Sequence, residues 1–159
     1  MILDLKIYPA DILRKQAEEV QYPLAENTRK LIRDMFDTVR SANGIGLAAP
    51  QVGKSQRLIV INLEHLDVPL FALINPVIID FSKKKSTMEE GCLSIPGVFG
   101  MVERPERIRV KAQDLKGKIV EAEAEGLLAR VIQHETDHIN GVLIIDKIKK
   151  YTKGKELVQ

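Results

Sequence analysis

Two histidines stand four positions apart near the carboxyl end of the sequence, and a glutamate directly follows the first: His134, Glu135 and His138. On an α-helix, residues i and i+4 lie one turn apart on nearly the same face, so both imidazoles can reach one metal ion. The glutamate can then act as the proton carrier for a water molecule at that ion. This spacing predicts metal-assisted hydrolysis, although a surface helix with two histidines has the same pattern.

The surrounding residues favour a helix that carries these side chains on one face. Leu127, Val131, His134 and His138 follow one another at helical steps, forming a stripe that changes from apolar residues to metal-ligand types. Asn140-Gly141 is a typical helix stop. The stripe favours the metal-ligand interpretation of the histidine pair over a surface helix.

A catalytic metal site needs a third protein ligand and one open position. Cys92 is one candidate, because a thiolate binds borderline and softer metals strongly and this cysteine lies among turn-forming residues. Glu156 is the alternative downstream of the histidine pair, as in zinc peptidases, but it stands in a charged terminal segment. His65 lies in a polar turn, where we expect it to be exposed. Cys92 is the only cysteine, so an internal disulfide is excluded.

A second unusual stretch spans residues 44–53, which are apolar, rich in small side chains and uncharged. Gly44 and Gly46 permit close approach of the backbone to a ligand, and Pro50 stiffens the end of the stretch. Gln51 is then a lone polar group on an apolar loop, which indicates either a binding contact or a buried, hydrogen-bonded glutamine. The Gly-Lys-Ser/Thr ending of a phosphate-binding loop is missing.

The elements that must position these residues follow from hydrophobic spacing. Apolar residues at helical intervals predict a helix over residues 26–41, after a lead-in segment with a short helical patch at 11–16. Alternating and β-branched runs predict strands at 57–63 and 71–79 and a hairpin of 107–113 with 118–123. Residues 89–97 read as a loop carrying Cys92, residues 142–145 as a short strand, and residues 147–159 as a solvated basic tail.

Composition limits the class of protein. The 159 residues, 45% hydrophobic and 29% charged, predict a single globular domain over residues 1–159. A net charge of +2 gives no reason to expect direct nucleic-acid binding. No apolar run is long enough to span a membrane, and the first residues lack the order of a signal peptide, so we expect a cytoplasmic protein that does not bind membranes.

Three segments in this order, residues 44–51, 90–94 and 133–138, resemble the signatures of the peptide deformylases, and the resemblance extends over nearly the whole chain. It implies an α+β fold in which antiparallel β-sheets wrap around a central helix carrying the histidine motif. It also implies a metal-dependent hydrolase that removes the N-terminal formyl group, as formate, from formyl-methionine of newly synthesised polypeptides.

The resemblance implies one divalent metal per chain, bound by Cys92, His134 and His138. Ferrous iron is expected by similarity to the family, with zinc, nickel or cobalt possible in preparations. The residues themselves do not choose, because two imidazoles and a thiolate also suit zinc.

The same resemblance assigns the chemistry to three residues. Glu135 would take a proton from the attacking water and deliver it to the leaving amine. The Gln51 side-chain amide and the Leu93 backbone N–H would bind the oxygen that becomes negative in the tetrahedral intermediate. That role explains an uncharged donor on an apolar loop.

The expected substrate is an extended peptide that begins with formyl-methionine. Its backbone would pair with the loop containing Gly44, Ile45 and Gly46, and with the segment after Ile95. The methionine side chain would enter an apolar pocket formed with the histidine helix; Leu127 and Val131 are the predicted lining residues, and Met88 is a further candidate.

Two features differ from relatives in this resemblance. Some members carry a basic residue shortly after the cysteine motif that contacts the peptide, whereas residues 98–101 are uncharged here. Nascent peptides imply proximity to the ribosome, but the short tail gives no support for docking by that segment.

A hypothesis for the surroundings of the metal is that Arg104 pairs with Glu90 or Asp137, because carboxylates near metal ligands need partners.

Two other functions fit part of the pattern. A zinc endopeptidase would use Glu156 as its third ligand. A metal-stabilised peptide-binding module would fill all four coordination positions with protein ligands and would need no proton carrier. Glu135 and Gln51 argue against the binding module.

Overall fold

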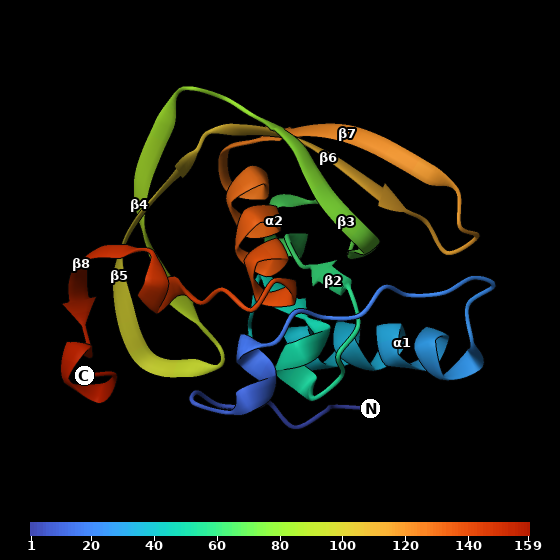
Figure 1. Ribbon diagram of the computed structural model, residues 1–159, viewed down its shortest axis with the longest axis horizontal. Helices are drawn as coiled ribbons and strands as arrows, with labels where there is room; N and C mark the ends of the chain where they lie inside the picture. Colours follow the sequence, from blue (N-terminus) through green and yellow to red (C-terminus); the bar gives the residue numbers. More distant parts are fainter.

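The computed structural model describes residues 1–159 as two helices and two antiparallel sheets. Figure 1 shows helix α2 (Gly126–Ile139) in the middle of the molecule, with strands β3, β6 and β7 passing over it and β4, β5 and β8 beside it. Helix α1 (Glu26–Ser41) lies on the opposite side of α2 from β6 and β7 (Figure 1). The expected α+β class, with sheets around the histidine helix, is confirmed.

The larger sheet has five strands in the order β1-β2-β3-β6-β7. They are β1 (Gly46–Ala48), β2 (Leu58–Ile61), β3 (Phe71–Phe81), β6 (Arg107–Gln113) and β7 (Ile119–Glu125). The smaller sheet has the order β4-β5-β8, formed by Lys85–Cys92, Ile95–Pro105 and Ile148–Lys153. The predicted helix at 26–41, the strands near 57–63 and 71–79, and the 107–123 hairpin are all present.

The core explains why α2 is central. Val131, Ile132 and Ile139 of α2 pack with Ile59 and Ile61 of β2 in one apolar cluster. Most residues of α2 are buried, including the polar Gln133, Glu135 and His138, so the helix carries its chemistry into the interior. A helix that is buried on most of its faces must be surrounded by other elements. The strands around α2 cover these faces.

The apolar face of α1 forms the second cluster. Met35 and Val39 are completely buried against Leu58 and Val60 of β2. The larger sheet is therefore covered by α2 through one set of side chains and by α1 through the alternating set, as the two faces of β2 require. No helix is long and apolar enough to cross a membrane.

Three sequence-based assignments were wrong. Residues 89–97 are not a loop: they end β4, turn tightly and begin β5, and a register shift between Gly91 and Cys92 interrupts the pairing. The polar outer face of β4 conceals the strand, because its stability comes from pairing with β5. Residues 142–145 lead into a 3₁₀ turn, Ile144–Asp146, in place of a strand.

The third wrong assignment is the solvated tail. Strand β8 pairs with β5, and a 3₁₀ turn, Lys155–Leu157, follows it. Ile148, Tyr151 and Val158 pack on a third apolar cluster that contains Leu143, while the lysines between them point to solvent. The basic residues dominate the composition, but a few apolar residues anchor the segment.

Candidate metal centre and active site

Cys92, His134 and His138 lie together although the cysteine is far from the histidines in sequence. Their ligand atoms all lie within 4.8 Å of one another, and Cys92 Sγ is 3.3 Å from His138 Nε2. The helix supplies both imidazoles from one face, and the end of β4 brings the thiol to them. One thiol and two imidazoles fit a divalent ion such as zinc or ferrous iron.

The groups around the two imidazoles determine where their protons lie. His134 Nδ1 lies 2.9 Å from Glu90 Oε1, so its N–H donates to the carboxylate and the Nε2 lone pair is left for a metal. Burial alone would raise the pKa of Glu90, but hydrogen bonds from His134 and Arg104 hold it well below its usual range. Burial lowers the pKa of His138, which favours the neutral ring that a metal binds.

Arg104 supports the hypothesis of paired carboxylates around the metal ligands. Its Nε and Nη2 donate to Glu90 Oε2 and Oε1 at 2.6 and 2.9 Å, and its Nη1 donates to Asp137 Oδ2 at 2.9 Å. The side chain is 2% exposed. Arg104 therefore pairs with both candidates at once, and a second buried arginine, Arg130, donates to Glu90 Oε2 at 2.6 Å.

Replacing Arg104 with alanine is expected to weaken metal binding by about 10- to 100-fold and to lower turnover, since Glu90 would lose the bidentate contact that orients it toward His134. Metal titration and formate release measure the two effects. Arg40→Ala is the matched control, because Arg40 makes the same two-point contact with Glu64 at the exposed surface. Unchanged metal content and turnover in Arg104→Ala would disprove this role.

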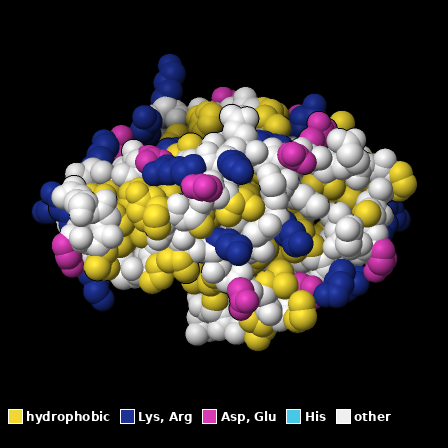
Figure 2. Space-filling model, turned by 60° about the horizontal axis from the view of Figure 1, so that its bottom comes forward, with side chains coloured by type: hydrophobic (Ala, Val, Ile, Leu, Met, Phe, Trp, Pro, Cys, Tyr) yellow, Lys and Arg dark blue, Asp and Glu magenta, His cyan; other side chains and the backbone are white.

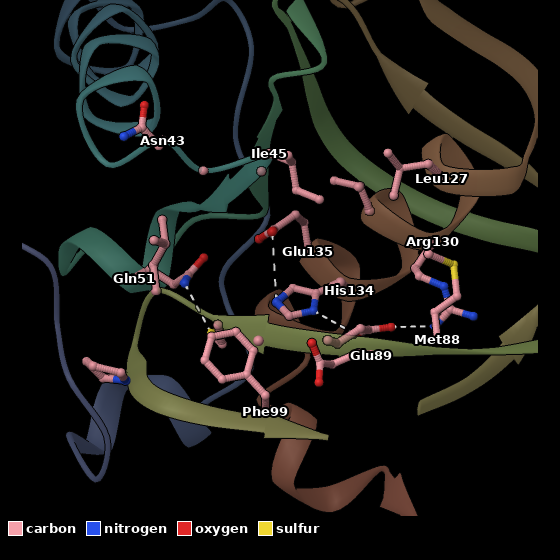
Figure 3. A pocket seen from close by; sticks show the side chains of 18 of the residues that line it. Asn43, Ile45, Gln51, Met88, Glu89, Phe99, Leu127, Arg130, His134 and Glu135 are labelled. Carbon is pink, nitrogen blue, oxygen red and sulfur yellow. Dashed lines mark hydrogen bonds and ion pairs between the residues drawn. The ribbon is translucent and has the colours of Figure 1, made fainter. Parts of the chain in front are cut away.

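Gln51 is buried beside the cysteine, on the 3₁₀ turn Ala49–Val52 that follows β1. The Ala48 backbone N–H donates to Gln51 Oε1 at 2.9 Å, which fixes the amide orientation. Its Nε2 consequently points toward the site, 3.2 Å from Ser94 Oγ and 3.6 Å from Cys92 Sγ (Figure 3). The amide thus presents its donor, and not its acceptor, to the ligand cluster.

Glu135 lies on the cavity side of the same cluster. Burial raises the pKa of its carboxyl to about 7, and its Oε2 is buried without a hydrogen-bond partner. Gly46 passes so close that an added Cβ would lie 2.7 Å from Glu135 Oε1 and 2.8 Å from Val131 Cγ1. The glycine at position 46 therefore lets the loop backbone pack against the carboxylate, while its predicted close approach to a ligand stays a prediction.

These groups open onto a cavity of about 450 Å³ between the glycine loop, α2 and the β4–β5 hairpin (Figure 3). All of the predicted peptide-binding residues line it: Gly44, Ile45, Gly46, Leu127 and Val131. Gln51, Leu93 and Met88 line it as well. His138 is not among its lining residues and is buried behind the cluster.

Several lining residues were absent from the sequence-based site, among them Phe99 and Arg130. Arg130 is the one charged residue in the otherwise apolar run 127–132, and that was the available signal. No sequence signal pointed to Phe99, because its position depends on the pairing of β5 with β4. The two other metal-ligand candidates lie elsewhere: Glu156 is exposed in the terminal 3₁₀ turn, and His65 is exposed after β2.

The fold and the site define a metal-dependent hydrolase, since the ligand cluster faces a cavity and has a buried carboxylate and an amide donor beside it. The chain belongs to the polypeptide deformylase family, whose model matches residues 2–154. Enzymes of this family remove the N-terminal formyl group from nascent polypeptides in a metal-dependent reaction, and this chain has that activity.

Individual relatives agree with this membership. The peptide deformylase of Thermodesulfovibrio yellowstonii is 49% identical over 149 residues, covering 92% of this chain and 89% of the relative. The crystal structure of peptide deformylase from Thermotoga maritima matches with a TM-score of 0.88 and 44% identity, over 94% of this chain and 99% of that one. The enzyme from Synechococcus elongatus, solved in complex with actinonin, matches with a TM-score of 0.87 and 47% identity, over 93% and 79%.

Proposed function

We propose that Cys92, His134 and His138 bind the metal of this deformylase and that Glu135 is its proton carrier. The observation that carries the proposal is the group of three ligand atoms within 4.8 Å of one another, with the Glu135 carboxylate beside it at the wall of the cavity. A bound divalent ion would make a water molecule more acidic and would polarise the formyl carbonyl. Residues of the protein carry out the proton transfer and bind the oxygen that becomes negative.

Glu135 accepts the proton of the attacking water and later delivers it to the nitrogen of the leaving amine. A buried carboxyl whose pKa is raised to about 7 suits both steps, because it can be ionised before attack and protonated afterwards near neutral pH. Its unpartnered Oε2 leaves one oxygen free for this exchange.

Gln51 and Leu93 bind the developing negative charge on the formyl oxygen. The contact from Ala48 to Gln51 Oε1 supports this role, since it leaves the Nε2 hydrogens facing the cluster. Leu93 lies in the turn between β4 and β5 and lines the cavity, which supports a role for its backbone N–H as the second donor. Donors fixed before the reaction need no rearrangement in the transition state.

The peptide lies extended between the loop of Gly44, Ile45 and Gly46 and the start of β5. Leu127 and Val131 form the methionine pocket, and their positions on α2, about two turns and one turn before His134, support this. The formyl carbon then reaches Glu135 when the side chain is seated. Residues after methionine leave along β5.

We also propose ferrous iron as the metal used, because a thiolate and two imidazoles accept it, with zinc, nickel and cobalt as substitutes. Residues 1–159 would act as one catalytic domain, since α2 contacts strands of both sheets. The enzyme would work in the cytoplasm on formyl-methionine peptides near the ribosome, without docking through β8.

The test is an anaerobic assay of iron-loaded protein on a formyl-Met peptide, an acetyl-Met peptide and a peptide with only internal amides. Formate release from the first substrate alone is expected. Air exposure should inactivate the iron-loaded protein faster than a nickel-loaded sample, since ferrous iron beside a thiolate is readily oxidised. Cleavage of the internal amide would show an endopeptidase, and equal air stability would argue against iron dependence.

A further inference from the structure

The carboxyl-terminal strand reaches the rim of the active-site cavity. Lys153 is the register partner of Phe99 in the pairing of β8 with β5, and Phe99 lines the cavity. The next residue, Gly154, has a φ of 78° and packs so closely that an added Cβ would collide with the carbonyl oxygen of Gly97, another lining residue. The end of β8 is therefore fixed against the rim.

Lys153 places a positive charge at this rim. Its Nζ lies 5.9 Å from the centroid of the Phe99 ring, within the range of a cation–π contact. No carboxylate lies within ion-pair distance of Lys153, whereas Lys149 on the same strand pairs with Glu103 at 3.1 Å. The Lys153 ammonium is thus held by the aromatic ring and remains available to an anion.

Two other charged side chains, Glu89 and Arg130, line the cavity. The Thr152 hydroxyl donates to Glu89 Oε2 at 2.6 Å, which ties that carboxylate to β8. Arg130 is buried and is engaged with Glu90, the Val102 carbonyl and Ser86. Among these groups, Lys153 is the cation without a carboxylate partner.

The position of Phe99 indicates which part of a peptide would meet this charge. In Figure 3, Phe99 lies on the opposite side of His134 from Leu127 and Ile45, away from the proposed methionine pocket. Its strand, β5, is the one along which the peptide leaves the site. Phe99 and Lys153 therefore face residues that follow the methionine.

We propose that Lys153 is a specificity-determining residue that favours formyl peptides with a carboxylate shortly after the methionine. The proposal rests on the deformylase function and on the peptide direction given above. Because the ammonium is exposed, the expected preference is modest, about 2- to 5-fold in kcat/KM at low salt, and it should decrease as ionic strength rises.

Three peptide amides provide the test: formyl-Met-Ala followed by glutamate, glutamine or lysine. The unaltered enzyme should prefer glutamate over its uncharged isostere glutamine, and glutamine over lysine, mainly through KM. Lys153→Met should make the glutamate and glutamine peptides equivalent, and Lys153→Glu should reverse the order. Using the ratio of two peptides within each variant cancels any general change in activity.

Lys150→Met is the matched control, because Lys150 is an exposed lysine of the same strand that has no ion pair and does not line the cavity. It should keep the preference of the unaltered enzyme. Equal rates on the glutamate and glutamine peptides, a preference that survives Lys153→Met, or an equal loss in Lys150→Met would each overturn the proposal. Failure of the unaltered enzyme to release formate from the glutamine peptide would instead count against the proposed function.

Discussion

Replacing Glu135 with alanine is expected to lower turnover by about 10² to 10⁴-fold or more while the metal stays bound, which is the range for loss of a general acid–base group. The structure explains the size of the effect. Glu135 is buried beside the ligand cluster and its Oε2 has no protein partner, so this oxygen is free to exchange a proton with the attacking water. Formate release and metal content measured on the same sample test both parts.

The pH profile gives a second measurement on Glu135. As a base it must be ionised, so kcat/KM should rise with pH through its pKa and level off above it. Burial raises that pKa to about 7, and the positive charge of a bound ion would lower it, so the rise should fall at or below about pH 7. The alanine variant should lose this limb of the profile.

Glu156→Ala is the matched control for Glu135→Ala. Glu156 is exposed in the terminal 3₁₀ turn, so its loss should change neither metal content nor formate release. Metal loss in that variant would revive the peptidase arrangement with a carboxylate ligand. Full turnover in Glu135→Ala would rule out the assigned proton carrier.

Replacing Gln51 with leucine is expected to reduce kcat by about 10² to 10³-fold through loss of one donor to the developing oxyanion. Leucine fills a similar volume, so the ligand cluster should keep its metal. The effect should fall on kcat more than on KM, because the donor acts mainly on charge that appears in the transition state. Steady-state kinetics on a formyl-Met peptide and metal analysis measure the result.

A second replacement at the same position separates the donor from the rest of the side chain. Gln51→Glu keeps an oxygen that can accept from the Ala48 N–H but removes the donor, so it should be at least as inactive as Gln51→Leu. Gln56→Leu is the control for a general effect of losing a glutamine, since Gln56 does not line the cavity. Near-normal kcat in either Gln51 variant would contradict the oxyanion role.

The sequence by itself determined the two helices, four of the eight strands and the types of residue that carry the chemistry. Helical spacing gave α1 its correct bounds and placed His134 and His138 on one face of α2. Such patterns can be read locally because a helix repeats its contacts within one turn. The resemblance of three short segments to the deformylases then indicated that Cys92 and Gln51 belong with the histidines.

Only the tertiary structure decided how those segments meet. Strand β4 has a polar, exposed face and pairs with β5 through contacts that no local pattern announces, so the loop expected around Cys92 is the tight end of a hairpin. The orientation of the Gln51 amide depends on a backbone contact, which residue types cannot reveal.

The carboxyl-terminal segment is the clearest case. Its lysines predict a solvated tail, yet pairing with β5 makes it a strand and brings Lys153 to the rim of the cavity. Strand pairing depends on partners distant in sequence, and a few partly buried apolar residues can outweigh a basic composition. The sequence thus determined which groups are reactive. The pairing of strands that are distant in sequence determined the positions of these groups and which residues line the cavity.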